Sequence, residues 1–177
     1  APPVRRLIRR LRRDRASVQE ELISALRTDR YLAALDLAEA GSRHPQVIPS
    51  DVSLHEIAAA EFRKLRKAVR ALPELPSDEE LHRVRIKVKR ARYAAELAET
   101  TVGRPASRFI QRAMELQDIL GMHQDAVVAE GRVRLYLDES QSRTAAFAAG
   151  RMVERQRQRK LRARGQFALA WKKLEKR

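Results

Sequence analysis

Residues 81–97 carry basic side chains at a spacing that could do chemistry. The side chains recur every three or four residues: His82, Arg85, Lys89 and Arg92. On a helix that turns about 100° per residue, this spacing places all four on one face. The forked donors of arginine match phosphate oxygens, and lysine adds a compact charge. The pattern therefore predicts a helix face that binds phosphate-like anions.

Apolar positions flank this face on the helical wheel. Leu81, Val84 and Val88 lie on one side, and Ile86 and Leu97 lie on the other. Clustered cations repel one another unless an anion joins them, so we expect the face to line a groove that takes a polyanion. The remaining arc is predicted to be an ordinary solvated face and holds Arg83, Lys87, Arg90 and Ala94.

Two other interpretations of these residues stay open. The cations could form salt bridges with acidic residues of neighbouring helices, for which Glu56, Glu61, Asp118 and Asp125 are available. His82 alone could be an ordinary core histidine, which is the more common role for an isolated histidine.

Further arginines at helical spacing could extend a basic surface, or could simply be solvated. They form three sets: Arg9, Arg12 and Arg13; Arg108 and Arg112; and Arg155, Arg159 and Arg162. The net charge supports an acidic partner, because 38 Lys and Arg against 23 Asp and Glu give +15 over 177 residues. Such a charge favours nucleic acid, polyphosphate or an anionic surface.

The sequence offers little for catalysis, so we expect no enzyme activity and no cofactor. Cysteine is absent, which excludes disulfides, thiolate nucleophiles and cysteine-ligated zinc. The four histidines form no i, i+4 metal pair, and no glycine-rich phosphate loop occurs. Asp118 and Asp125 could hold a divalent cation, although hydrogen bonding to helix termini is more common. No metal site is expected.

Composition and periodicity predict an all-α chain of about seven helices with short connections, packed as antiparallel bundles. Capping boxes at Ser53 and Ser77 should open two of the helices. Residues 41–52 are the best linker. Gly121 should separate a helix that begins after Pro105 from one that runs to Ser140. We expect residues 1–50 to form one bundle remnant and residues 51–177 a second bundle.

The basic helix resembles the CHAD domain, the conserved histidine α-helical domain. Its family pattern H-x-x-R-[VI]-x-x-K-R-x-R-Y-x-x-E is matched from His82 to Glu96. The segment from Leu116 to Asp125 is similar to the family's L-Q-x-x-L-G-x-x-x-D motif.

The resemblance implies a pseudo-symmetric pair of helical bundles around a basic channel, and binding of inorganic polyphosphate without catalysis. The family carries its histidine helix twice, whereas this sequence holds only the second copy, so the architecture is expected to be partly truncated at the N-terminus. Other phosphate or sulfate anions are further ligands to expect. A cytoplasmic location, including polyphosphate granules, is expected, without membrane contact.

Two other functions stay open, a nucleic-acid-binding helical module and an adaptor for an acidic protein. Duplex nucleic acid is disfavoured, because a duplex about 20 Å wide exceeds the ~8–10 Å between packed helices. Only 5% of the residues are aromatic, so few platforms exist for stacking single-stranded bases.

Overall fold

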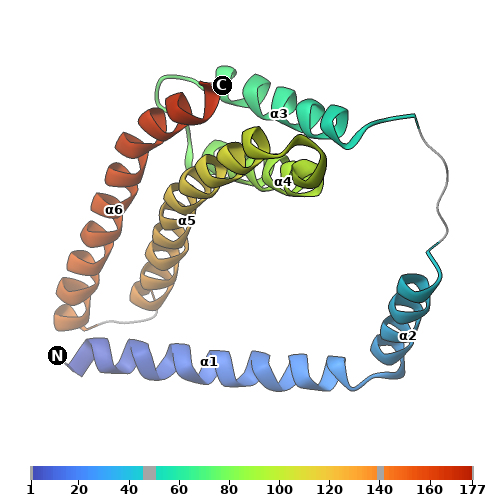
Figure 1. Ribbon diagram of the computed structural model, residues 1–177. Helices are drawn as coiled ribbons and strands as arrows, with labels where there is room; N and C mark the ends of the chain where they lie inside the picture. Colours follow the sequence, from blue (N-terminus) through green and yellow to red (C-terminus); the bar gives the residue numbers. More distant parts are fainter. Residues whose placement is uncertain (1, 46–50, 139–141, 177) are drawn as a thin grey trace.

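The computed structural model describes residues 2–45, 51–138 and 142–176, and these residues are all-α, as predicted. Within them the chain forms α1 (Pro2–Leu26), α2 (Asp29–Arg43), α3 (Leu54–Arg70), α4 (Asp78–Val102), α5 (Arg104–Asp138) and α6 (Arg143–Glu175) (Figure 1). None of these helices is long and apolar enough to span a bilayer.

Helices α3 to α6 pack around one core in two antiparallel pairs, α3 with α4 and α5 with α6, which agrees with the predicted antiparallel packing (Figure 1). The long helices α5 and α6 lie side by side, and α3 and α4 pack against one end of them (Figure 1). The core contains Leu65 of α3, Val88 of α4, Leu116 of α5 and Trp171 of α6. Phe62 stands between two aromatic neighbours, with its ring 5.3 Å from Phe109 and 6.4 Å from Trp171. This cluster joins three of the four helices.

Side-chain caps mark where four helices begin, including α6, where the Ser142 hydroxyl accepts the backbone N–H of Ala145. Ser53 and Ser77 form the predicted capping boxes with Glu56 and Glu80, so α3 and α4 start where the sequence indicates. Thr28 caps α2, and its hydroxyl accepts the backbone N–H of Tyr31 at 3.4 Å. Each cap satisfies backbone donors that have no partner within the helix.

The break predicted at Gly121 is wrong. Helix α5 runs through this residue for 35 residues, so the two predicted helices are one and the described residues form six helices rather than seven. A glycine inside a helix costs only about 1 kcal/mol. Leu116, Leu120 and Ala126 are buried on either side of it, and their burial outweighs that cost. Helix α2 extends through Gly41, the first residue of the predicted linker, and ends at Arg43.

Helices α1 and α2 are covered by the rest of the chain only near the start of α1. Leu7 is buried with Val133 of α5 and Ala149 of α6, and Leu11 packs beside them. From Arg12 to Pro45 every described residue is exposed (Figure 1). We call residues 16–43 the arm. Residues 46–50, the centre of the predicted linker, lie outside the described residues.

Candidate functional site

Helix α4 positions the basic side chains by burying its opposite side. Leu81, Val84, Val88 and Ala91 are at most 2% exposed and face α3 and α5. This anchored face fixes the rotation of the helix about its axis. The four predicted site residues then lie half-buried along one shoulder of α4, and we call them the basic stripe: His82, Arg85, Lys89 and Arg92.

The surroundings of the basic stripe differ in part from the prediction. One flank is the core, as expected, but on the other flank Ile86 and Leu97 are 40% and 65% exposed. Arg83 and Arg90 are exposed, as predicted, whereas Lys87 is half-buried and Ala94 is buried. The helix buries a wider arc than the apolar pattern indicated, because the small alanine fits against the core and the lysine can bury its stem while its charged head stays in water.

Arg92 of the basic stripe is largely enclosed, because only 15% of its side chain is exposed. Its Nε donates to Gln117 of α5 at 3.1 Å, and its Nη1 donates to Glu96 at 2.5 Å. The Tyr93 ring lies against two cations, 4.5 Å from the Arg92 guanidinium and 5.8 Å from Lys89 Nζ. These contacts hold one end of the basic stripe in place.

The other members of the basic stripe lack such partners. Among the described residues, no carboxylate lies within 4 Å of the side-chain nitrogens of His82, Arg85 or Lys89. His82 Nδ1 and Arg85 Nε are buried atoms without any hydrogen-bond partner. The four acidic residues that could have neutralised the stripe, Glu56, Glu61, Asp118 and Asp125, form no ion pair with it. Arg85 and Lys89 therefore carry positive charge that no carboxylate of the described residues compensates.

The other predicted site residues are not brought together with the basic stripe into one pocket. Arg9, Arg12 and Arg13 are exposed on α1, and Arg108 is exposed on α5. Arg112 holds the end of α6, because its Nη1 donates to the carbonyls of Lys173 and Lys176 at 2.9 and 2.6 Å. This role is structural.

Arg155, Arg159 and Arg162 form an exposed ridge along α6. Arg155 lines a pocket where α1 meets the start of α6, beside three more arginines and an apolar floor that includes Phe147 and Met152. The additional arginines are Arg6, Arg143 and Arg151.

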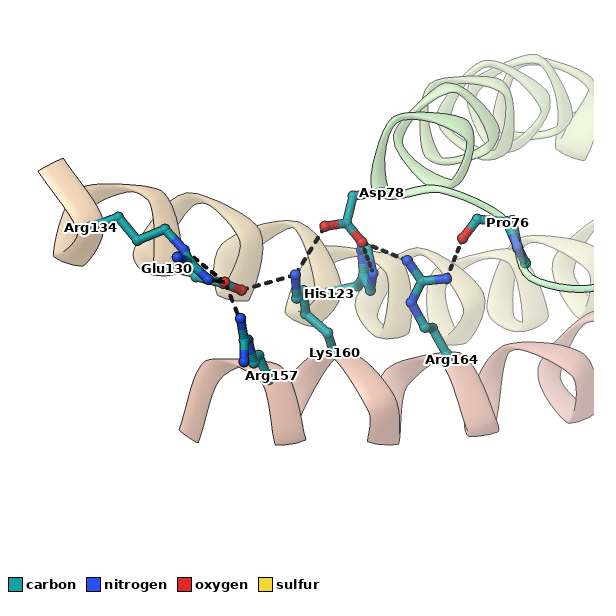
Figure 2. A network of polar contacts seen from close by, with 8 residues as sticks. All are labelled: Pro76, Asp78, His123, Glu130, Arg134, Arg157, Lys160 and Arg164. Atoms are coloured by element: carbon teal, nitrogen blue, oxygen red, sulfur yellow. Dashed lines mark hydrogen bonds and ion pairs between the residues drawn. The ribbon is translucent and has the colours of Figure 1, made fainter. Parts of the chain in front are cut away.

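Sequence reasoning missed a network that joins α4, α5 and α6 (Figure 2). Asp78, in the first turn of α4, binds Lys160 Nζ at 3.0 Å and Arg164 Nη2 at 2.5 Å, both from α6. Arg164 also donates to the Pro76 carbonyl. His123 of α5, 1% exposed, has Nε2 3.2 Å from Asp78 Oδ1, although the two groups are not aligned as a hydrogen bond.

Glu130 extends the network along α5. Lys160 lies 2.9 Å from Glu130 Oε2 and so bridges two carboxylates, while Arg134 and Arg157 approach Glu130 Oε1 at 2.7 and 3.6 Å (Figure 2). The network thus joins α4, α5 and α6. Its residue on α4, Asp78, lies four residues before His82, the first residue of the basic stripe.

The pKa shifts of the network follow from burial and pairing. Burial raises the pKa of Asp78 and of Glu130, but hydrogen bonds from Lys160 and a neighbouring arginine outweigh it, and both pKa values are lowered. Burial lowers the pKa of Lys160, and its two carboxylate partners reverse this, so the net pKa is raised. Burial also lowers the pKa of His123 and outweighs the attraction of Asp78. These groups are therefore charged at neutral pH except His123.

A signal for this network was present in the sequence. Lys160 and Arg164 interrupt the apolar face of α6 that holds Ala163, Phe167 and Trp171. Cations on a buried face require carboxylate partners. The pattern could not say which carboxylates meet them, because Asp78 is more than 80 residues away along the chain.

Comparison with known proteins agrees with the resemblance seen in residues 82–96. The model of the CHAD domain family matches residues 1–134. Two uncharacterized proteins of Mycobacterium tuberculosis, from strains CDC 1551 / Oshkosh and ATCC 25618 / H37Rv, are each 29% identical over 174 residues, which cover 93% of this chain. The chain spans 33% of the length of each of these relatives. No solved structure matches the chain. Because the family model covers most of the sequence, including the whole of the basic stripe, the chain belongs to the CHAD domain family.

Proposed function

We propose that this chain binds inorganic polyphosphate along the basic stripe of α4, without catalysis. The observation that carries the proposal is the pair of buried, unpartnered nitrogens, His82 Nδ1 and Arg85 Nε, beside a lysine that has no carboxylate partner. Phosphate oxygens would supply the negative charge that these half-buried side chains lack, since hydrogen bonds between ionised groups are among the strongest in proteins. Membership of a family associated with polyphosphate supports the same ligand.

The shape of the stripe favours a thin polyanion. From His82 to Arg92 the stripe extends roughly 15 Å at 1.5 Å per residue, and it is one side chain wide. A single linear chain of phosphates can follow such a row, whereas a duplex about 20 Å across would contact it at few points. The exposed strip formed by Ile86 and Leu97 offers such a ligand no charge, so the phosphates should stay on the row.

The test is calorimetric titration of the chain with long-chain polyphosphate at near-physiological salt, with duplex DNA as competitor. We expect binding that DNA does not displace, and polyphosphate recovered afterwards with its length unchanged. Displacement by DNA would favour a nucleic-acid-binding module. Absence of polyphosphate binding would favour an acidic protein partner, and shortened polyphosphate would mean catalysis.

A matched pair of double variants locates the site. Arg85→Ala with Lys89→Ala should weaken binding about tenfold or more, because hydrogen bonds to charged groups contribute roughly 1.5–3 kcal/mol each. Arg83→Ala with Arg90→Ala removes the same charge from the exposed side of α4 and should have a much smaller effect. Equal losses from both variants would mean diffuse attraction without a site. The salt dependence should also become shallower only in the first variant.

A further inference from the structure

Arg92 is oriented by three contacts that lie entirely within the packed helices α4 and α5. Its Nε donates to Gln117 Oε1 of α5 at 3.1 Å, and its Nη1 donates to Glu96 at 2.5 Å. The guanidinium also lies over the Tyr93 ring, 4.5 Å from the ring centroid. Because the guanidinium is planar, contacts to two of its nitrogens and to one face fix the orientation of the whole group.

Part of this oriented guanidinium remains available to a ligand. An arginine carries five N–H donors, and Gln117 and Glu96 accept one each. Nη2 has no hydrogen-bond partner among the described residues, and it is not a buried atom. Its two N–H groups are therefore free to donate to an anion.

The partner that α5 offers to Arg92 is neutral, unlike the partners of the arginines that join helices in the network. Arg164 of α6 pairs with the Asp78 carboxylate at 2.5 Å, and such a pair cancels charge. Gln117 instead provides an amide oxygen, which accepts the N–H and adds no negative charge. Glu96 does offset the charge, but its side chain is 37% exposed and lies one turn along the same helix, so water weakens this pair.

The bond between Arg92 and Gln117 joins two backbones that packing holds in place. Leu116, next to Gln117 on α5, is fully buried. Ala91 and Ala95, on either side of Arg92 along α4, are 1% and 5% exposed. A side chain that is ordered on a fixed backbone loses less conformational entropy when a ligand binds.

From these observations we infer that Gln117 is a positioning residue for anion binding, which presents the Arg92 guanidinium to polyphosphate with its charge intact. The inference rests on the proposed function of the basic stripe and adds to it a residue from a second helix. Gln117 acts through Arg92 and needs no contact with the ligand. A carboxylate in its place would hold the same N–H but would compete with the phosphates for the guanidinium.

The test is calorimetric titration of the full chain with long-chain polyphosphate as the probe. Gln117→Met keeps the helix propensity, removes the acceptor and should weaken binding about threefold to tenfold. The control Gln111→Met makes the same exchange at an exposed position of α5 and should leave binding unchanged. Gln117→Glu should also weaken binding, because its charge opposes that of the ligand. Binding as tight as that of the unaltered chain in either Gln117 variant would overturn the inference.

The same exchange in an Arg92→Ala background separates positioning from a general effect on the fold. Gln117→Met should cause no further loss there, because the group that Gln117 orients is absent. An equal loss in both backgrounds would mean that Gln117 acts on the fold or on the ligand itself, and would contradict the inference. An unaltered chain that bound no polyphosphate would overturn the proposed function together with this inference, whereas unchanged binding in Gln117→Met would overturn the inference alone.

Discussion

Asp78 is the single carboxylate on which Lys160 and Arg164 converge, and its side chain is 33% exposed. Asp78→Asn should lower the free energy of unfolding by about 1–3 kcal/mol, since the partly buried Arg164 loses its carboxylate partner and Lys160 is left with Glu130 alone. The low end applies if water reaches the site. Urea denaturation followed by far-ultraviolet circular dichroism gives the value.

The neighbouring Glu79 supplies the control for this change. It pairs with Arg83 at 3.1 Å, one turn away on the same helix, and both side chains are well exposed. Glu79→Gln should leave the unfolding transition nearly unchanged, because exposed pairs on a helix contribute little. If both variants unfolded at the same urea concentration, the contacts of Asp78 would stabilise the fold no more than an exposed ion pair does.

His123 should make stability fall in weak acid. Its pKa is lowered by burial from the usual 6.5, so the unfolded chain binds the proton more tightly than the folded chain. The stability is therefore fully present above about pH 6.5, and it is lost as pH falls toward the folded-state pKa, by up to about 1.4 kcal/mol per pH unit. Unfolding measured between pH 7 and 5 should show this slope, and His123→Gln should flatten it.

The carboxylates and the lysine of the network change the stability outside the range between pH 7 and 5. Asp78 and Glu130, with lowered pKa values, lose their contribution below their usual 3.8 and 4.5. Lys160, with a raised pKa, keeps its contribution up to its usual 10.5 and loses it at higher pH. If the stability of the His123 variant still fell between pH 7 and 5, a group other than His123 would be responsible for the pH dependence.

At the scale of the helices, two glycines should respond to alanine in opposite directions. Gly121 lies inside α5, and an added Cβ meets no atom within 4 Å, so Gly121→Ala should raise the free energy of unfolding by about 0.5–1 kcal/mol. Gly103 ends α4 with a φ of 69°, so Gly103→Ala should lower it by about 1–3 kcal/mol. Thermal denaturation of both variants shows whether the signs differ.

The starts of helices were predicted well where residues close together in the sequence determine them. Ser53 and Ser77 cap their own helices through residues three positions away, so α3 and α4 begin as expected. Gly121 was misjudged because its local preference is overridden by the burial of leucines on either side. The basic stripe followed from spacing alone, whereas the bonds of Asp78 to α6 depend on contacts distant in sequence.

At the scale of the whole molecule, the chain has a packed body and an exposed arm. Amides in the arm should exchange hydrogen with little protection in dilute solution, because none of its described residues is buried, while α4 and α5 should exchange slowest. Hydrogen exchange measured by mass spectrometry separates the two parts. Protection equal to that of α5 in dilute solution would contradict the exposed position of the arm.

Trp171 is the one tryptophan of the sequence, and it is 8% exposed beside Phe62 in the packed body. Its fluorescence therefore samples a site where α3 and α6 meet, well away from the arm. The emission of Trp171 should stay at short wavelength while the arm melts. It should shift to longer wavelength when the packed body unfolds and water reaches the indole ring. Tryptophan fluorescence therefore reports unfolding of the packed body and does not respond to melting of the arm.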